Sequence, residues 1–276
     1  MRFQIKRLIS QFILFISANL GALGFKTGFC YPFFYCNSCP AATSACPLRA
    51  IEQSVYKGSF YWRLLLFPIF ILGFFGVTSG RGVCGWACPI GLLQRLTSRI
   101  ARRVKKNPRI KKIGQLRIER YLRYIKYFVL IILVVLTTYI IGFMFTDICP
   151  IGFLTGTIPT LILYPSKFVP NPFFWIAFII FILFLILILL IERGWCKYFC
   201  PIGAILAPFN KVSLLSVSRV DKNIFDKECI HCNACVNICP MGIDVINMNR
   251  DPECILCGKC VNVCPKNLIK FERVKL

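Results

Sequence analysis

Two uninterrupted apolar runs constrain the fold of this 276-residue chain more than any other feature. One is VLIILVVLTTYIIGFMF and the other is FWIAFIIFILFLILILL, and each approaches or reaches the roughly 20 apolar residues that cross a bilayer. Weaker apolar segments begin at Leu8, where Gln11 interrupts the run, and at Trp62, where Pro68 predicts a kink. A hydrophobic content of 57% and a mean hydropathy of +0.67 are typical of a membrane protein. The sequence predicts a membrane α-helical fold with four spans, at about 8–25, 62–78, 121–145 and 172–191.

Lysine and arginine set the predicted orientation of these spans. The chain has 34 basic and 11 acidic residues, a net charge of +23, and its segment 81–126 is far more basic than 146–171. By the positive-inside rule, 81–126 is cytoplasmic and 146–171 is external. We therefore expect a multi-pass protein of the cytoplasmic (inner) membrane, with a retained first helix, both termini cytoplasmic and an external loop over 26–61. The basic excess then reflects contact with the lipid membrane, and we expect no nucleic-acid partner.

An eleven-residue motif occurs twice. RGVCGWACPIG begins at Arg81 and RGWCKYFCPIG begins at Arg193, each at the cytoplasmic end of a predicted span. A weaker echo of the same motif, Cys-Pro, recurs at Cys46 and Cys149 on the predicted external side. The membrane domain, predicted over 1–215, is therefore expected to consist of two parallel repeat units, which place functional groups where they meet.

Each copy of this motif contains Cys-x-x-x-Cys. The spacing places two thiols on one face of a helical turn, and two facing pairs would supply the four thiolates of an iron–sulfur cluster. The alternative is packing, because free cysteine behaves as a small apolar residue. The predicted inner redox or cluster site consists of Cys84, Cys88, Cys196 and Cys200.

A doubled run of eight cysteines carries the strongest signal. CIHCNACVNICP begins at Cys229 and CILCGKCVNVCP begins at Cys254, and both fit C-x2-C-x2-C-x3-C-P, in which the fourth cysteine ligates the other cluster. One [4Fe–4S] cluster is assigned Cys229, Cys232, Cys235 and Cys264. The second is assigned Cys254, Cys257, Cys260 and Cys239. A zinc site is the weaker alternative, and we expect His231 to point outward. These residues predict a C-terminal α+β two-cluster ferredoxin domain over 216–276, closed by a short strand after 267.

Five further cysteines fall on the predicted external side, and they are Cys30, Cys36, Cys39, Cys46 and Cys149. Three interpretations compete for them. An oxidising compartment favours disulfides, whereas the Cys-x-x-Cys core and the Cys-Pro ending favour an external cluster. Packing alone is the third. One or two iron–sulfur clusters beyond the ferredoxin pair are therefore compatible with the sequence.

The composition also excludes several classes of protein. The chain has a single histidine, whereas haem held between membrane helices needs two axial ligands of that kind, so we expect no haem. No Gly-x-Gly-x-x-Gly motif for NAD, no flavin motif and no P-loop occurs. A transporter is disfavoured because the spans lack paired charges.

The order of these motifs resembles the NapH/MauN-type membrane ferredoxins, a polyferredoxin-like family. The matching residues are the two Cys-x-x-x-Cys-Pro motifs and the doubled run from Cys229 to Pro265, and the likeness covers roughly 60–265. It implies a membrane-bound electron carrier, an accessory subunit of a larger redox system rather than a stand-alone enzyme, with a redox protein as donor and another as acceptor. A quinone near Trp86 or Trp195 is a further candidate partner. The alternative function is an assembly or maturation factor that uses a thiol–disulfide or metal-reducing relay on a client protein.

Overall fold

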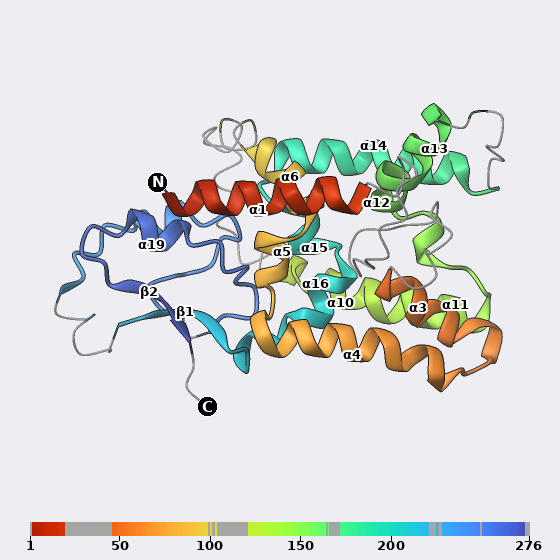
Figure 1. The fold of residues 1–276 in the computed structure, drawn as a ribbon, viewed down its shortest axis with the longest axis horizontal. Coiled ribbons are helices and arrows are strands. Elements are labelled where there is room, and N and C mark those ends of the chain that lie inside the picture. The colour runs from red at the N-terminus through yellow and green to blue at the C-terminus, as the bar shows by residue number, and fades with distance from the viewer. Residues whose placement is uncertain are drawn as a thin grey trace.

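The computed structural model describes residues 2–19, 46–98, 100, 103, 121–163, 165, 172–220, 225, 228–248 and 250–273. Three helices run along the long axis of the molecule: α1 (Arg2–Asn19), α4 (Trp62–Ser79) and α14 (Phe174–Leu190) (Figure 1). A fourth, interrupted helix consists of α10 (Ile125–Phe128), the π-helical η3 (Val129–Leu136) and α11 (Thr137–Ile140). It ends at Ile140, five residues before the end of the predicted span 121–145.

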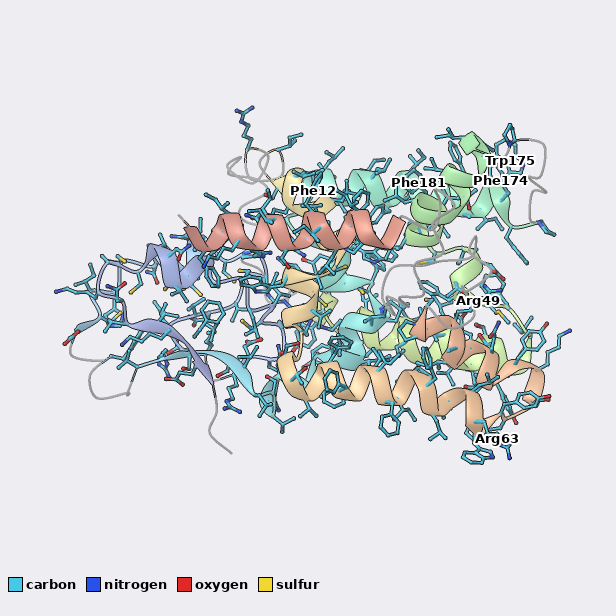
Figure 2. All side chains as sticks on the ribbon, in the orientation of Figure 1. Phe12, Arg49, Arg63, Phe174, Trp175 and Phe181 are labelled. Carbon is cyan, nitrogen blue, oxygen red and sulfur yellow. The ribbon has the colours of Figure 1, made fainter. Side chains whose placement is uncertain are left out.

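Within the described part of the chain, one helix is long and apolar enough to cross a membrane, and that helix is α4. The segment Ile125–Ile140 and helix α14 are apolar but shorter. The prediction of four spans is therefore not confirmed by helix length. The outward faces of these helices are nevertheless strongly apolar, since Phe70 of α4 is 76% exposed and Trp175 of α14 is 72% exposed. Phe12 of α1 is 53% exposed, and Figure 2 shows Trp175 of α14 near the outer edge of the molecule.

The two segments predicted as external contain helices that pack into the molecule. The first holds α3 (Pro47–Ser54) and the turn η2 (Tyr56–Gly58), and α3 packs along α4. The second holds η4 (Phe145–Asp147), α12 (Pro150–Gly152), η5 (Phe153–Thr157) and α13 (Ile158–Leu163). Both α3 and α12 begin with a proline at their first position, where the missing N–H has no cost because it would have no helical partner.

Short helices fill the centre of the fold, and they arise from the repeated motif. The first copy forms α5 (Gly82–Trp86) and α6 (Pro89–Leu96), and the second forms α15 (Gly194–Tyr198) and α16 (Pro201–Leu206). In each copy the chain breaks at the second cysteine because the proline that follows it disfavours helical backbone at the preceding residue. Figure 1 shows α5, α15 and α16 between α1 and α4.

The C-terminal segment contains a two-stranded antiparallel sheet, β1 (Leu215–Arg219) with β2 (Ile269–Arg273), in which Val217 pairs with Phe271. The predicted closing strand is thereby confirmed. The turn η7 (Pro208–Lys211) leads into β1, and the short helices α18 (Ala234–Asn237) and α19 (Lys259–Val263) lie between the strands in sequence. The ring of Phe3 in α1 lies 4.9 Å from that of Phe271, so the start of α1 and the sheet lie at the same end of the molecule (Figure 1).

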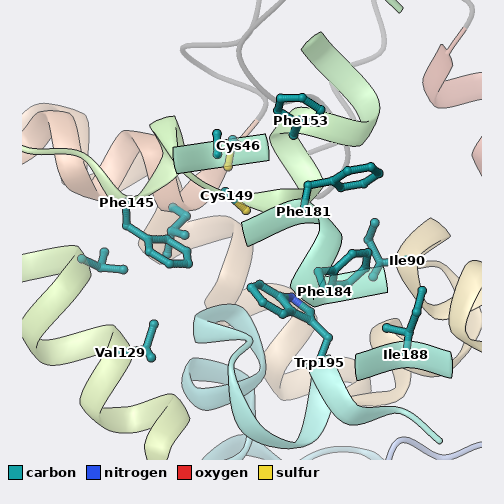
Figure 3. Close-up of a cluster of buried hydrophobic side chains, with 13 residues drawn as sticks. Cys46, Ile90, Val129, Phe145, Cys149, Phe153, Phe181, Phe184, Ile188 and Trp195 are labelled. Atoms are coloured by element: carbon teal, nitrogen blue, oxygen red, sulfur yellow. The ribbon is translucent and has the colours of Figure 1, made fainter. Parts of the chain in front are cut away.

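Two hydrophobic cores hold these parts together. The first surrounds the side chains of Phe145, Phe181, Phe184 and Trp195 and includes two cysteines (Figure 3). Phe184 is 2% exposed, and full burial of such a side chain contributes roughly 1.5–3 kcal/mol. The second core joins Leu72 of α4 and Leu206 of α16 to apolar residues between 217 and 269. The C-terminal segment therefore shares a core with the helices.

Candidate metal centres

Six cysteines line one apolar cavity of about 60 Å³ at the centre of the fold. They are Cys46, Cys84, Cys88, Cys149, Cys196 and Cys200. The sequence predicted an inner site and an external site for them, whereas in the structure all six face one cavity, with Cys46 and Cys149 only 6% and 7% exposed. The physical reason is that α3 and α12 start within the core, so the cysteine before each proline is drawn inward. Cys30, Cys36 and Cys39 lie outside the described residues.

The arginine that begins each copy of the repeated motif hydrogen-bonds to the other copy. Arg81 donates from Nη2 to the carbonyl oxygen of Cys196 at 2.8 Å, and Arg193 donates from Nη1 to that of Cys84 at 3.1 Å. Each guanidinium also lies against the glycine of a Pro-Ile-Gly sequence. A Cβ atom added at Gly91 would lie 2.7 Å from Arg193 Nη1, and one at Gly203 would lie 3.1 Å from Arg81 Nη2. Glycine at these positions permits the close approach.

Buried positive charge lies beside the two copies of the repeated motif. Arg7, Arg81, Lys126 and Arg193 are each at most 2% exposed. Among the described residues, one acid forms a salt bridge with these cations. It is Glu253, which contacts both Arg81 and Lys126. Two guanidinium nitrogens of the set, Arg81 Nε and Arg193 Nη2, have no hydrogen-bond partner. Uncompensated buried cations cost several kcal/mol each, so the surroundings fit an anionic occupant such as a thiolate-bound cluster.

Two hydrogen bonds reach the sulfurs directly. Gln94 donates from Nε2 to Cys196 Sγ at 3.2 Å, and the backbone N–H of Gly203 donates to Cys200 Sγ at 3.4 Å. Donors of this kind stabilise sulfur ligands and tune the reduction potential of a cluster. Gln94 is fully buried, and the sequence analysis missed it. Its counterpart six residues after Cys200 is the apolar Leu206, so the two halves of the site are not equivalent.

The C-terminal cysteines form two sets that differ in burial. The set Cys239, Cys254, Cys257 and Cys260 lines a cavity of about 20 Å³. Burial raises the pKa of Cys254 well above its usual value and the pKa of Cys260 to about 12. Cys254 and Cys260 therefore hold their protons until a metal displaces them. In the other set, Cys232 is exposed, as is the neighbouring His231.

Among the described residues, no three His, Cys, Asp or Glu side chains converge tightly enough to bind a single metal ion. A cubane places each thiolate on a different iron, so its ligands lie further apart than those of one ion. The donor set around both cavities consists of cysteine sulfur, which suits iron–sulfur clusters.

The cysteine set that includes Cys254 and Cys257 packs directly against the first copy of the repeated motif. The carbonyl oxygen of Ile255 lies so close to Gly85 that an added Cβ would be 2.1 Å from it. Trp86 donates from Nε1 to the carbonyl oxygen of Leu256 at 2.9 Å. Arg7 donates to the carbonyl oxygen of Gly85 at 2.6 Å, and its neighbour Gln4 donates to that of Cys257 at 3.0 Å. The backbone between two predicted cluster ligands therefore touches the residue after Cys84.

A buried ion cluster and an amide hold this contact in place. Glu253 accepts from Arg81 and from Lys126. Burial would raise the pKa of Glu253, but the charges of Arg81 and Lys126 outweigh that effect and hold the pKa below its usual value. Asn210 donates from Nδ2 to the carbonyl oxygens of Pro252 and Cys254, at 3.0 and 2.7 Å. Its own Oδ1 accepts from the backbone N–H of Arg81 at 2.7 Å.

Comparison with known proteins places the chain among ferredoxin-type proteins. A family model described as a 4Fe-4S binding domain matches twice, over residues 60–108 and 173–220, and one described as a 4Fe-4S dicluster domain matches 211–275. No solved structure matches the chain.

Several curated proteins are similar to the chain, some over most of its length and some over a short part. An uncharacterized protein of Methanocaldococcus jannaschii is 30% identical over 88% of this chain and 85% of its own length. The methylamine utilization ferredoxin-type protein MauN of Methylobacillus flagellatus is 23% identical over 68% of this chain and 58% of its own length. The ferredoxin-type protein NapH of Escherichia coli is 28% identical over 23% of this chain and 21% of its own length. The chain belongs to the NapH/MauN-type family of ferredoxin-type electron-transport proteins.

Proposed function

We propose that the chain is an integral-membrane iron–sulfur protein that passes electrons between its cytoplasmic ferredoxin clusters and a redox partner on the external side of the membrane. The observation that carries this proposal is the contact of the 254–257 loop with Gly85, between Cys84 and Cys88. It joins a predicted ferredoxin cluster to a second set of buried cysteines through directly touching backbone. A chain whose only role was to bind a soluble partner would not need such a junction.

We assign the proposed cluster ligands from the cysteines that line the two cavities and from the doubled cysteine motif. Two [4Fe–4S] clusters are held by the eight C-terminal cysteines, with Cys264 and Cys239 crossing between sets. A further centre is held in the core, where Cys84, Cys88, Cys196 and Cys200 are candidates. When bound, these clusters supply one-electron transfer. Arg81 and Arg193 offset the negative charge of the core centre, and Gln94 donates to one of its sulfurs.

The burial of the cysteine sets indicates the order in which electrons pass between the centres. The set containing Cys232 is partly exposed, and a soluble donor reaches it without any rearrangement. In the set containing Cys257, both Cys257 and Cys260 are buried, and the loop before Cys257 lies against Gly85. We therefore assign the exposed set to exchange with the cytoplasmic partner and the buried set to exchange with the core. MauN and NapH are named as ferredoxin-type proteins, which supports a place within a larger redox system.

The membrane topology is part of this proposal. Exposed apolar side chains on α1, α4, η3 and α14 would form the lipid-facing surface, since patches of that extent seldom face water. The contact between Phe3 and Phe271 supports placing the start of α1 on the same side as the ferredoxin segment. The basic segment 81–126 makes that side cytoplasmic by the positive-inside rule.

The test uses the full chain reconstituted into vesicles that enclose ferricyanide, with a membrane-impermeant reductant outside. We expect reduction of the enclosed ferricyanide, and we expect Cys84→Ser to abolish it while the C-terminal clusters still accept electrons. Leu96→Ser, which alters a side chain that is 60% exposed on α6, serves as the matched control. Equal internal reduction by the wild type, Cys84→Ser and protein-free vesicles would overturn the proposal.

A further inference from the structure

We infer that Cys46 and Cys149 are ligands of the core centre, rather than members of an external cluster or a disulfide framework. This inference rests on the proposed function and revises the ligand set of the centre proposed there. A cubane takes four thiolates, of which Cys46 and Cys149 would supply two and the inner cysteines, Cys84 among them, the others. It changes the position of that centre as well. A site reached by both the cytoplasmic and the external Cys-Pro motifs lies in the middle of the membrane domain.

The first argument is backbone geometry. Four cysteines each sit at the position before a helix whose first residue is proline, with extended backbone at the cysteine. Their φ and ψ angles are −100° and 109° at Cys46, −67° and 122° at Cys88, −65° and 123° at Cys149, and −72° and 111° at Cys200. The proline that follows each cysteine imposes this conformation. The two outer cysteines therefore enter the core with the same backbone as the two inner ones.

The second argument is convergence on one cavity. All four of these cysteines, together with Cys84 and Cys196, line the same cavity, whose other lining side chains are almost entirely apolar. Figure 3 shows the side chains of Cys46 and Cys149 next to each other among Phe145, Phe181 and Trp195. Chain segments more than 100 residues apart thus deliver their sulfurs to one dry space, which is how a protein assembles a buried cluster site.

The third argument concerns the sequence around the sulfur atoms. At Cys200 the backbone N–H of Gly203 donates to the sulfur at 3.4 Å, and backbone N–H groups directed at sulfur are a standard feature of iron–sulfur sites. The sequence Cys-Pro-Ile-Gly is repeated at Cys149. Cys149 therefore has the same local sequence as a predicted ligand from the inner motif.

The test compares iron and acid-labile sulfide per chain, with EPR spectra, in anaerobically purified wild type, Cys84→Ser, Cys46→Ser and Cys149→Ser. Phe145→Leu is the matched control, because it alters the lining of the same cavity without removing a sulfur. We expect Cys46→Ser and Cys149→Ser to lose the iron and the EPR signal that Cys84→Ser loses, roughly four iron atoms for one cubane. Phe145→Leu should retain both.

Two results would overturn the inference while sparing the proposed function. One is full retention of the core signal in both outer variants when Cys84→Ser loses it. The other is a Cys46–Cys149 disulfide, found by mass spectrometry of wild-type protein that retains the core signal. If wild type and Cys84→Ser both hold only the iron of the doubled motif, the core centre itself is absent. In that case the proposed function fails together with the inference.

Discussion

The C-terminal cysteines and the core cysteines reach their sites by opposite routes. Eight cysteines of the C-terminal segment lie between Cys229 and Cys264, in two closely spaced runs. The six core cysteines are distributed from Cys46 to Cys200 and meet only because four helix starts converge. The first kind of site is encoded locally and the second depends on tertiary structure. A local site tolerates changes elsewhere in the chain, whereas a convergent site depends on every segment that contributes to it.

The two sites also differ in their electrostatic surroundings. The core cavity has Arg81 and Arg193 in reciprocal contact with the opposite motif, and both are almost fully buried. The exposed C-terminal set has water beside Cys232 instead. Water lowers the cost of charge at the exposed set, whereas the core must balance charge with its own cations. The comparison therefore predicts different sensitivities to substitution.

The largest effect should follow removal of a buried C-terminal thiol. We expect Cys257→Ser to eliminate one cluster, a loss of roughly four irons per chain, and to loosen the docked loop because Cys257 is in the second core. The exposed Cys232→Ser is the comparison, and its iron loss should leave the loop docked. Iron analysis combined with proteolysis of the native protein distinguishes the two. Equal protease sensitivity would show that burial does not separate the two sets.

The next effect concerns the ion cluster that joins the two regions. Glu253→Gln leaves Arg81 and Lys126 buried without an acid, so we expect a loss of about 3–5 kcal/mol in stability, measured by thermal unfolding in detergent. Glu228→Gln is a matched control, because Glu228 precedes Cys229 as Glu253 precedes Cys254 but is exposed. It should change stability by less than about 0.5 kcal/mol. Comparable losses in both variants would contradict a role for the ion cluster.

A smaller effect is expected from overpacking the junction. Gly85→Ala places a Cβ at 2.1 Å from the Ile255 carbonyl oxygen, which should cost about 1–3 kcal/mol. It should also slow electron transfer from the C-terminal clusters to the core without loss of iron. Rapid-mixing absorption spectroscopy measures this transfer rate. Gly73→Ala is the control because no atom lies within 4 Å of the added Cβ. An unchanged transfer rate in Gly85→Ala would argue against this junction as the electron path.

The smallest effect is expected from a single hydrogen bond. Trp86→Phe removes the donor to the Leu256 carbonyl oxygen and should cost about 0.5–1.5 kcal/mol. Hydrogen exchange at the 254–257 backbone, measured by mass spectrometry, should rise in this variant. Trp62→Phe, at a side chain that is 59% exposed, should leave that exchange unchanged. A matching rise in both variants would show that the bond does not hold the loop.

The sequence predicted the local features well because their signals are local. The closing strand, which pairs as β2, depends on neighbouring residues, and so does the doubled cysteine motif, which the 4Fe-4S dicluster model matches. The position of Cys46 and Cys149 was not predictable in this way. Hydropathy indicates where a segment leaves the membrane, but it does not show that α3 and α12 turn back into the core.

Buried polar partners were also beyond sequence reasoning. Gln94 lies in a segment rich in arginine and leucine, and nothing in its spacing indicates that its amide reaches Cys196. The pairing of Glu253 with Arg81 joins residues 172 positions apart. One signal for these contacts was present in the sequence. Both motifs begin with Arg-Gly, which fits the reciprocal arginine contacts in the structure.

The most direct test of a redox centre in the core is Mössbauer spectroscopy with iron quantification on the full chain, purified without oxygen. The measurement compares the wild type with a Cys84→Ser/Cys196→Ser double variant. At roughly four irons per cubane, we predict about twelve irons per chain in the wild type and about eight in the double variant. About eight irons in both proteins, with identical spectra, would confine the clusters to the C-terminal motif and contradict the account.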